Sequence, residues 1–152
     1  MHLLSIIISL ASILLINSVA ALPTNSTLVA RATAKQTQCF KEGAVFPRQD
    51  LEAYAKQLET VEFDKLLFIP HGRFINGVHN RVKVCAYNTF DKENTSVMNG
   101  VVATALYKIL DKCCKPDEFL CKGGYGQEKG QPKLFVDFVT RSITETCNKP
   151  YD

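Results

Sequence analysis

The chain has 152 residues, with 18 Lys and Arg against 15 Asp and Glu and a formal net charge of +3. So mild a positive balance excludes the strongly basic surface of a nucleic-acid-binding tail. Without an N-terminal signal segment about 130 residues are left, which is enough for one domain with a modest core.

The N-terminus has the pattern of a signal peptide. Residues 3–15 are almost wholly apolar, and small residues follow at 18–21, where signal peptidase would cut. We therefore predict a signal peptide over residues 1–21. A retained membrane anchor is the alternative, because residues 3–19 approach membrane-spanning length, but no Lys or Arg precedes this segment to orient it.

The next segment, residues 22–36, is rich in Pro, Thr, Asn, Ser and Ala without periodicity, which predicts a flexible leader or propeptide. Within it, Leu28-Val29-Ala30-Arg31 resembles the LxxR processing sites of some secreted fungal proteins, so we expect cleavage after Arg31. Asn25 and Asn94 stand in Asn-X-Ser/Thr triplets and are glycosylation candidates. The folded domain is expected over residues 37–152.

Strand and helix patterns alternate along this domain. Apolar residues at helical spacing predict one helix over residues 47–61, with Pro47 in its first turn, and a second from Thr95 as N-cap to Cys113. Short apolar or alternating runs predict strands over residues 37–40, 65–69, 81–87 and 133–140. Asn76-Gly77 is predicted as a tight turn, and residues 115–132 as a long polar loop.

The element order is therefore strand, helix, strand, strand, helix, strand. This order predicts an α+β fold, specifically an α/β sandwich of two split β-α-β units. In that arrangement one antiparallel sheet carries both helices on the same face, and the strands at 65–69 and 81–87 are adjacent.

The six cysteines indicate a disulfide framework. They stand at Cys39, Cys85, Cys113, Cys114, Cys121 and Cys147, and in an exported chain this even number predicts three bridges with fifteen pairings open. Cys113 falls on the buried stripe of the second helix and Cys114 points about a quarter-turn away, so we expect them to have different partners. A metal site is the alternative, but the clustered cysteines have no His nearby.

Few residues suggest catalysis. His71 and His79, with Arg73, could form a nuclease-type acid and base pair, although no carboxylate lies among them and exposed loop histidines are the simpler interpretation. Gly123-Gly124-Tyr125-Gly126 precedes a strand and not a helix, unlike a phosphate-binding loop. Lysines around the end of the second helix and in the following loop could form a basic rim that docks on an anionic partner. The simpler interpretation is that cations are favoured near a helix C-terminus in any case. The rim consists of Lys108, Lys112, Lys115, Lys122, Lys129 and Lys133.

Four features resemble the KP4-type killer toxins and related small secreted fungal effectors: Arg81-Val82-Lys83-Val84-Cys85, Lys112-Cys113-Cys114, the segment at 130–139 and the closing Cys147. The resemblance implies the same α/β sandwich. It also implies bridges from Cys85 to Cys147 and from Cys39 to Cys113 or Cys114; we predict Cys39 with Cys114 and Cys113 with Cys121. Family members inhibit growth by interfering with a cation channel, partly through an exposed basic residue, which by position would be Lys83.

We therefore expect a secreted, non-enzymatic toxin or virulence effector. Its partner would be a protein of a host or competitor cell, for example a membrane channel, with Lys83, Lys122 and Lys129 as binding residues. We expect no metal, cofactor or nucleic acid, and a monomer. The alternatives are a secreted RNase-like enzyme that uses His71 or His79, and a structural or masking protein on the surface of the producing cell.

Overall fold

The computed structural model describes residues 36–90, 92–132 and 134–147. All of them belong to one compact unit, which spans Thr33–Asp152. The predicted signal peptide, the leader up to residue 35, Asn25 and Arg31 lie outside the described residues.

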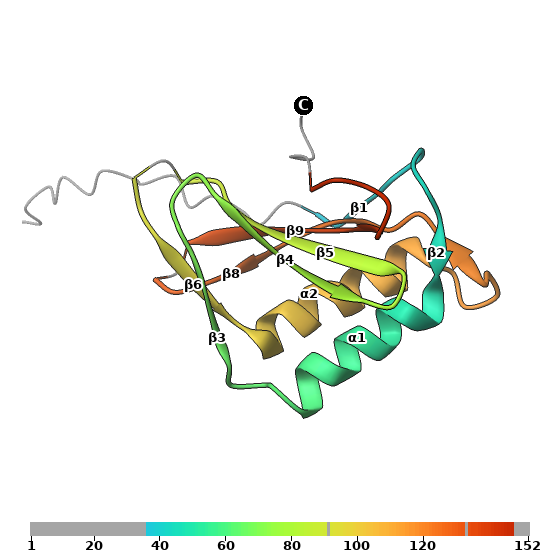
Figure 1. Ribbon diagram of the computed structural model, residues 1–152, viewed down its shortest axis with the longest axis horizontal. Helices are drawn as coiled ribbons and strands as arrows, with labels where there is room; N and C mark the ends of the chain where they lie inside the picture. Colours follow the sequence, from blue (N-terminus) through green and yellow to red (C-terminus); the bar gives the residue numbers. More distant parts are fainter. Residues whose placement is uncertain (1–35, 91, 133, 148–152) are drawn as a thin grey trace, which may run out of the picture. The chain divides into compact units, whose positions relative to one another are not determined.

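A five-stranded sheet with antiparallel neighbours forms the centre of this unit (Figure 1). Its strand order is β1-β8-β9-β5-β4. Successive side chains of a strand point to opposite faces, and the residues of β5 and β9 are largely buried on both. The strands are β1 (Gln38–Cys39), β4 (Phe74–His79), β5 (Val82–Asn88), β8 (Gly124–Lys129) and β9 (Phe135–Ser142).

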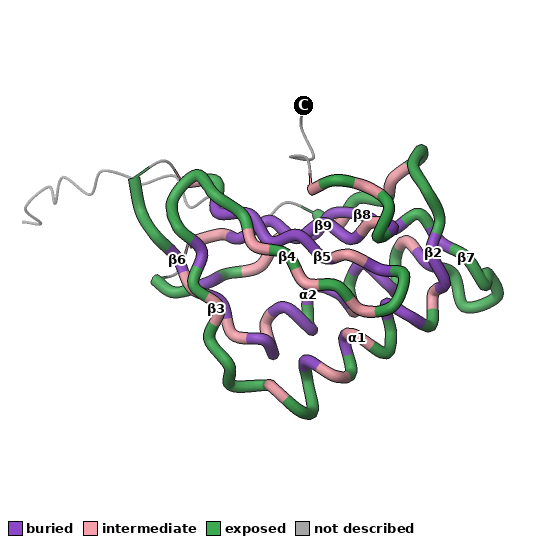
Figure 2. The backbone as a smooth tube through the Cα atoms, viewed as in Figure 1, coloured by how far each residue is buried: buried purple, intermediate pink, exposed green. Residues whose placement is uncertain are grey.

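Both helices pack on one face of this sheet (Figure 1). α1 (Arg48–Thr60) begins directly after Pro47, whose fixed φ suits a helix start. α2 (Asn99–Cys113) contacts α1, β8 and β9, and Figure 2 shows the central strands and the inner sides of the helices as buried. The core side chains include Leu51, Ala55, Leu58, Val102, Leu106, Ile109, Val136 and Phe138. The predicted α+β fold, with two helices packed against antiparallel sheets, is confirmed.

The start of the second helix was predicted three residues too early, because the N-cap is Met98 and not Thr95. Thr95–Met98 is a strand, β6, which pairs with β3 (Leu66–Ile69) in a separate two-stranded sheet. The first N–H groups of α2 are satisfied by distant carbonyls, since Asn99 N donates to Lys65 O and Gly100 N to Phe63 O, both at 3.0 Å. Thr95 is therefore not an N-cap, because tertiary contacts cap the helix.

The predicted pairing of the strands at 65–69 and 81–87 is also wrong. β5 pairs with β4, and the two strands form a hairpin in which His79 faces Val82. The turn lies at Asn80, whose φ of 50° is in the left-handed region that Asn tolerates. Gly77 belongs to the middle of β4 and not to a turn. A glycine is needed there because the Tyr54 hydroxyl occupies the space that a Cβ would take.

Residues 115–132, predicted as a loop, contain two strands. β7 (Leu120–Cys121) pairs with β2 (Phe46–Pro47), and β8 is a full member of the main sheet. The glycines of β8 are typical of a loop by composition, and for this reason the segment was predicted as one. Here close packing requires them: a Cβ on Gly124 would come within 2.5 Å of Gln38 O and 2.9 Å of Cys113 Sγ.

One split β-α-β unit is present. β5 and β8 are both antiparallel to β9, which lies between them, so they run parallel to each other and α2 connects them. The second predicted unit does not form, because β3 lies outside the main sheet. Neither α1 nor α2 is long and apolar enough to cross a membrane.

Three disulfides join the segments: Cys39–Cys113, Cys85–Cys147 and Cys114–Cys121. The first two agree with pairings that the resemblance implies, which left the partner of Cys39 open between Cys113 and Cys114. The predicted pairs Cys39–Cys114 and Cys113–Cys121 are wrong. Cys113 is still helical and faces β1, which packs on α2, whereas Cys114 has extended backbone and turns to Cys121 in β7.

The opposite face of the sheet carries a smaller apolar cluster. It consists of Cys85, Tyr87, Tyr125 and Val139, with Phe40 and Cys147 packed against it. The chain after β9 is held there by the Cys85–Cys147 bridge and by Lys83, whose Nζ donates to Glu145 O at 2.6 Å.

Candidate functional site

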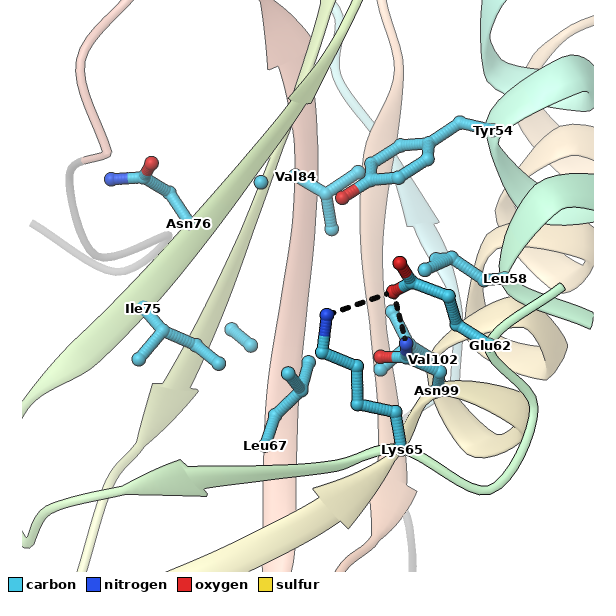
Figure 3. Close-up of a pocket in the computed structure, with 12 residues that line it drawn as sticks. Tyr54, Leu58, Glu62, Lys65, Leu67, Ile75, Asn76, Val84, Asn99 and Val102 are labelled. Carbon is cyan, nitrogen blue, oxygen red and sulfur yellow. Dashed lines mark hydrogen bonds and ion pairs between the residues drawn. The ribbon is translucent and has the colours of Figure 1, made fainter.

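A pocket lies between α1, β3 and the β4–β5 hairpin (Figure 3). Its volume is about 170 Å³. Because β3 is not part of the main sheet, it leaves a space between itself and the hairpin that a continuous sheet would close. The apolar walls are formed by Leu58, Leu67, Ile75, Val84, Ala86 and Val102.

One end of the pocket is polar. Glu62 Oε2 accepts hydrogen bonds from Lys65 Nζ and from Asn99 Nδ2, both at 3.1 Å. The Glu62 and Lys65 side chains are partly exposed, at 36% and 58%, whereas Asn99 is only 1% exposed. The ion pair therefore stands at the mouth of the pocket, and the amide lies at its floor.

Tyr54 contributes a hydroxyl from the helical wall (Figure 3). Its ring stacks on His79, with centroids 5.4 Å apart and an interplanar angle of 8°. Burial, and secondarily the negative charge of Glu62, raise the pKa of Tyr54 above its usual value. The hydroxyl is therefore neutral at physiological pH and available both to donate and to accept.

Asn99 has one unused acceptor. Its Oδ1 is buried and has no hydrogen-bond partner among the described residues. The amide orientation follows from chemistry, since turning the amide round would place Oδ1 against the Glu62 carboxylate. A buried acceptor without a partner costs about 1–3 kcal/mol.

A second candidate feature is a run of exposed apolar side chains, which we call the β3 surface: Leu66 and Phe68 in β3, and Phe63 in the turn that precedes it. Leu66 is 54% and Phe68 58% exposed, and Phe63 in the preceding turn is 53% exposed. Leu67 and Ile69 point the other way, toward the pocket and the core. Within the described parts of the chain, β3 pairs with β6 on one edge only.

Comparisons of the chain with protein-family models, with curated proteins and with solved structures find no match.

The lysines predicted to bind a partner lie apart. Lys83 is half-buried on β5 and bonded to Glu145 O. Lys122 precedes β8, where its Nζ donates to Lys41 O at 2.6 Å, and Lys129 ends β8, with its Nζ 5.6 Å from the centroid of the Phe135 ring. At about 3.3 Å per residue, Lys122 and Lys129 are on the order of 20 Å apart. The three do not form one site.

The basic rim is partly neutralised. Lys108 pairs with Glu128, and Lys115 pairs with Glu118 at 2.9 Å. The hydrogen bond and charge of Glu118 raise the pKa of Lys115. These pairs agree with the simpler interpretation of the rim, as cations balanced locally at a helix end.

The two histidines stand at opposite ends of β4. His71 N donates to Asn94 Oδ1 at 3.0 Å, and its Nδ1 lies 3.3 Å from the same oxygen. His79 is stacked on Tyr54. His71 lies before the first residue of the six-residue strand β4 and His79 is its last residue, so the two are about 20 Å apart and cannot act on one bond as an acid and base pair.

The sequence interpretation missed the pocket residues. Glu62 and Lys65 are only three positions apart, but their joining to Asn99 depends on β3 meeting β6. No local pattern signals that contact. The exposed face of β3 had a weak signal, because four consecutive apolar residues, Leu66–Ile69, cannot all be buried in a strand with one face covered.

Proposed function

We propose that this chain is a secreted, non-enzymatic toxin or effector that acts by binding a protein on the cells of another organism. The observation that carries the proposal is the β3 surface. Large apolar side chains scattered singly are ordinary on a protein surface, whereas a group of them marks an interaction site. Phe63, Leu66 and Phe68 expose more than half of their area within six residues of chain.

The partner we favour is an extended segment of a target protein. A strand with one edge unpaired can accept a further strand through its backbone groups, while alternate side chains such as Leu66 and Phe68 provide the specificity. β3 has only four residues and is bounded by Lys65 and Pro70. A charge and a proline at its ends limit open-ended aggregation, which favours a short, specific partner.

Two further observations support the proposal. Three disulfides in so small a domain are typical of proteins that work outside the cell. The residues that resemble KP4-type killer toxins supply the toxin or effector class. Among the forms of the RNase-like alternative, a pair of His71 and His79 as acid and base is not favoured, because the two residues lie about 20 Å apart.

The test is to apply purified, oxidised protein to fungal and plant cells and to measure cell binding, growth, membrane conductance and host defence. The decisive variant is Phe68→Glu, which puts a charge on the β3 surface. We expect at least a tenfold loss of binding and of any response, since burial of a phenylalanine at an interface contributes about 1.5–3 kcal/mol.

The matched control is Phe119→Glu, because Phe119 is 63% exposed at a different place. It should keep binding and activity. Equal losses in the two variants, or no response of any cell type to wild-type protein, would overturn the proposal. Binding to protein-free phosphatidylcholine vesicles that is lost in Phe68→Glu would instead indicate a lipid target and contradict a protein one.

A further inference from the structure

We propose that the Cys39–Cys113 disulfide is a redox switch: a dithiol opens it in the folded protein before the other two bridges react, and the opening releases β1 from the edge of the main sheet. The inference goes beyond the proposed function, because it concerns the chemistry of this chain alone and requires no target.

The three bridges differ in their exposure. Cys39 is exposed and Cys113 is half-buried. The short bridge is buried at both ends, since Cys114 is 0% and Cys121 is 4% exposed, and Cys85 in the remaining bridge is 0% exposed. Thiol–disulfide exchange requires a thiolate to reach one of the two sulfurs, so exposed bridges are the labile ones. Cys39–Cys113 is therefore the bridge that a reductant reaches most readily.

The point of attack within this bridge is Cys39. Cys113 Sγ lies close to the backbone of β8, since a Cβ on Gly124 would come within 2.9 Å of it. Cys39 stands in the edge strand, and its Sγ lies 3.5 Å from Lys112 O in an exposed position. A thiolate arriving from solvent therefore meets the Cys39 sulfur first.

The exchange balances with a dithiol as the reductant. Its first thiolate attacks Cys39 Sγ, the bond between the two cysteine sulfurs breaks, and Cys113 leaves as a thiolate that takes up a proton. The second thiol of the reductant then loses its proton and displaces Cys39 from the mixed disulfide. Two electrons pass to the bridge, both cysteines end as thiols, and the reductant ends as a disulfide.

β1 is held weakly apart from this bridge. It has two residues, Gln38 and Cys39, and both are exposed, so they bury little apolar surface. Its register with β8 covers two pairs, Gln38 with Tyr125 and Cys39 with Gly124. The hydrogen bonds of so few residues are offset by the entropy of ordering them. Loss of the bridge therefore frees the strand.

The release ends at Phe40. Its N donates to Gly123 O at 3.2 Å. Its ring packs against the small apolar cluster, and the guanidinium carbon of Arg141 lies 4.8 Å from the ring centroid. Phe40 thus stays in place when β1 leaves. β8 then loses its neighbour at Gly124 and Tyr125, and the backbone groups that β1 covered are exposed as a free sheet edge.

The experiment is the reduction of native, oxidised protein by dithiothreitol at pH 7 without denaturant. Samples are quenched with acid at intervals, alkylated with a maleimide and mapped by mass spectrometry. We expect Cys39 and Cys113 to be alkylated about tenfold faster than the other four cysteines, or more. Equal rates for all six, or faster alkylation of another pair, would overturn the proposal.

The release of β1 is measured by amide exchange in the partly reduced protein. The amides of Gln38 and Tyr125 should exchange about tenfold faster than in the oxidised protein, or more, while those of Val84 and Val139 in the central strands keep their protection. Unchanged exchange at Tyr125 would show that β1 stays in place. Faster exchange in the central strands would show general unfolding. Either result contradicts the proposal.

Two variants separate the switch from a general loss of stability. Cys39→Ser/Cys113→Ser should show the fast exchange at Tyr125 without any reductant; if it does not fold, the partly reduced wild-type protein supplies the same comparison. Cys114→Ser/Cys121→Ser, the matched control, lacks the short bridge. It should keep both the slow exchange at Tyr125 and the rapid reduction of Cys39–Cys113. Fast exchange at Tyr125 in the control would contradict the assignment to this bridge.

Discussion

Cys113 and Cys114 are neighbours in the chain, yet they fasten the end of α2 to two different sheets. Cys113 bonds to Cys39 beside the main sheet, and Cys114 bonds to Cys121 in β7. The end of the helix is thus held by two bridges that close loops of very different length. This difference gives the first prediction.

Removal of a bridge should destabilise the domain by an amount that grows with the logarithm of the loop length. The chain-entropy model gives about 4 kcal/mol for Cys39–Cys113, with a separation of 74 residues, and about 2 kcal/mol for Cys114–Cys121, with a separation of 7. Urea unfolding of Cys39→Ala/Cys113→Ala and of Cys114→Ala/Cys121→Ala measures both. A larger loss for the short loop would contradict the pairing or the model.

Gly124 should tolerate no side chain. A Cβ there would come within 2.5 Å of Gln38 O, so Gly124→Ala must push β1 away from β8, at a cost of about 1–3 kcal/mol. Gly72→Ala is the control, because Gly72 has a φ of +61° but open space around it, and only the backbone cost of about 1 kcal/mol applies. Equal urea midpoints for the two variants would show that β1 does not pack closely on β8.

Lys83 should contribute to stability whatever its role in binding. Its Nζ donates to Glu145 O at 2.6 Å and holds the chain that follows β9. Lys83→Met should lower the free energy of unfolding by about 1 kcal/mol and speed amide exchange near Glu145. Lys129→Met, at an exposed site, should change stability by less than about 0.5 kcal/mol. A loss of activity in Lys83→Met without these effects would instead favour a direct binding role.

Stability should fall at alkaline pH. Burial raises the pKa of Tyr87 from 10.0 to about 12, with Arg141 acting in the opposite direction. Between these two values the unfolded chain releases a proton that the folded chain keeps, so the stabilisation is complete below pH 10 and is lost as the pH rises through about 12. Unfolding measured from pH 9 to 12 should therefore show a steeper decline for wild type than for Tyr87→Phe. Parallel curves would contradict the assignment to this residue.

Much of the secondary structure could be predicted from local pattern. α1 and the body of α2 follow from apolar residues at helical spacing, and β5 and β9 from alternation, because each pattern reflects which side of one element is buried. β8 could not be recognised, since its first glycine, Gly124, is required by the close approach of Gln38 and Cys113, both distant in the chain.

The candidate site was less accessible to sequence analysis. The expected lysines and histidines are separated by whole strands in the structure. The pocket instead combines side chains from α1, the α1–β3 turn and the start of α2, which meet only through three-dimensional packing.

The sequence alone determined the two amphipathic helices, the even number of cysteines and the α+β class. These follow from periodicity and composition, which are carried by neighbouring residues. Only the tertiary structure decided which cysteines pair, that β3 joins β6 and not β5, and that Asn99 faces a pocket. The physical reason is that strand pairing and burial depend on segments tens of residues apart, whose backbone groups and side chains are satisfied only when those segments meet.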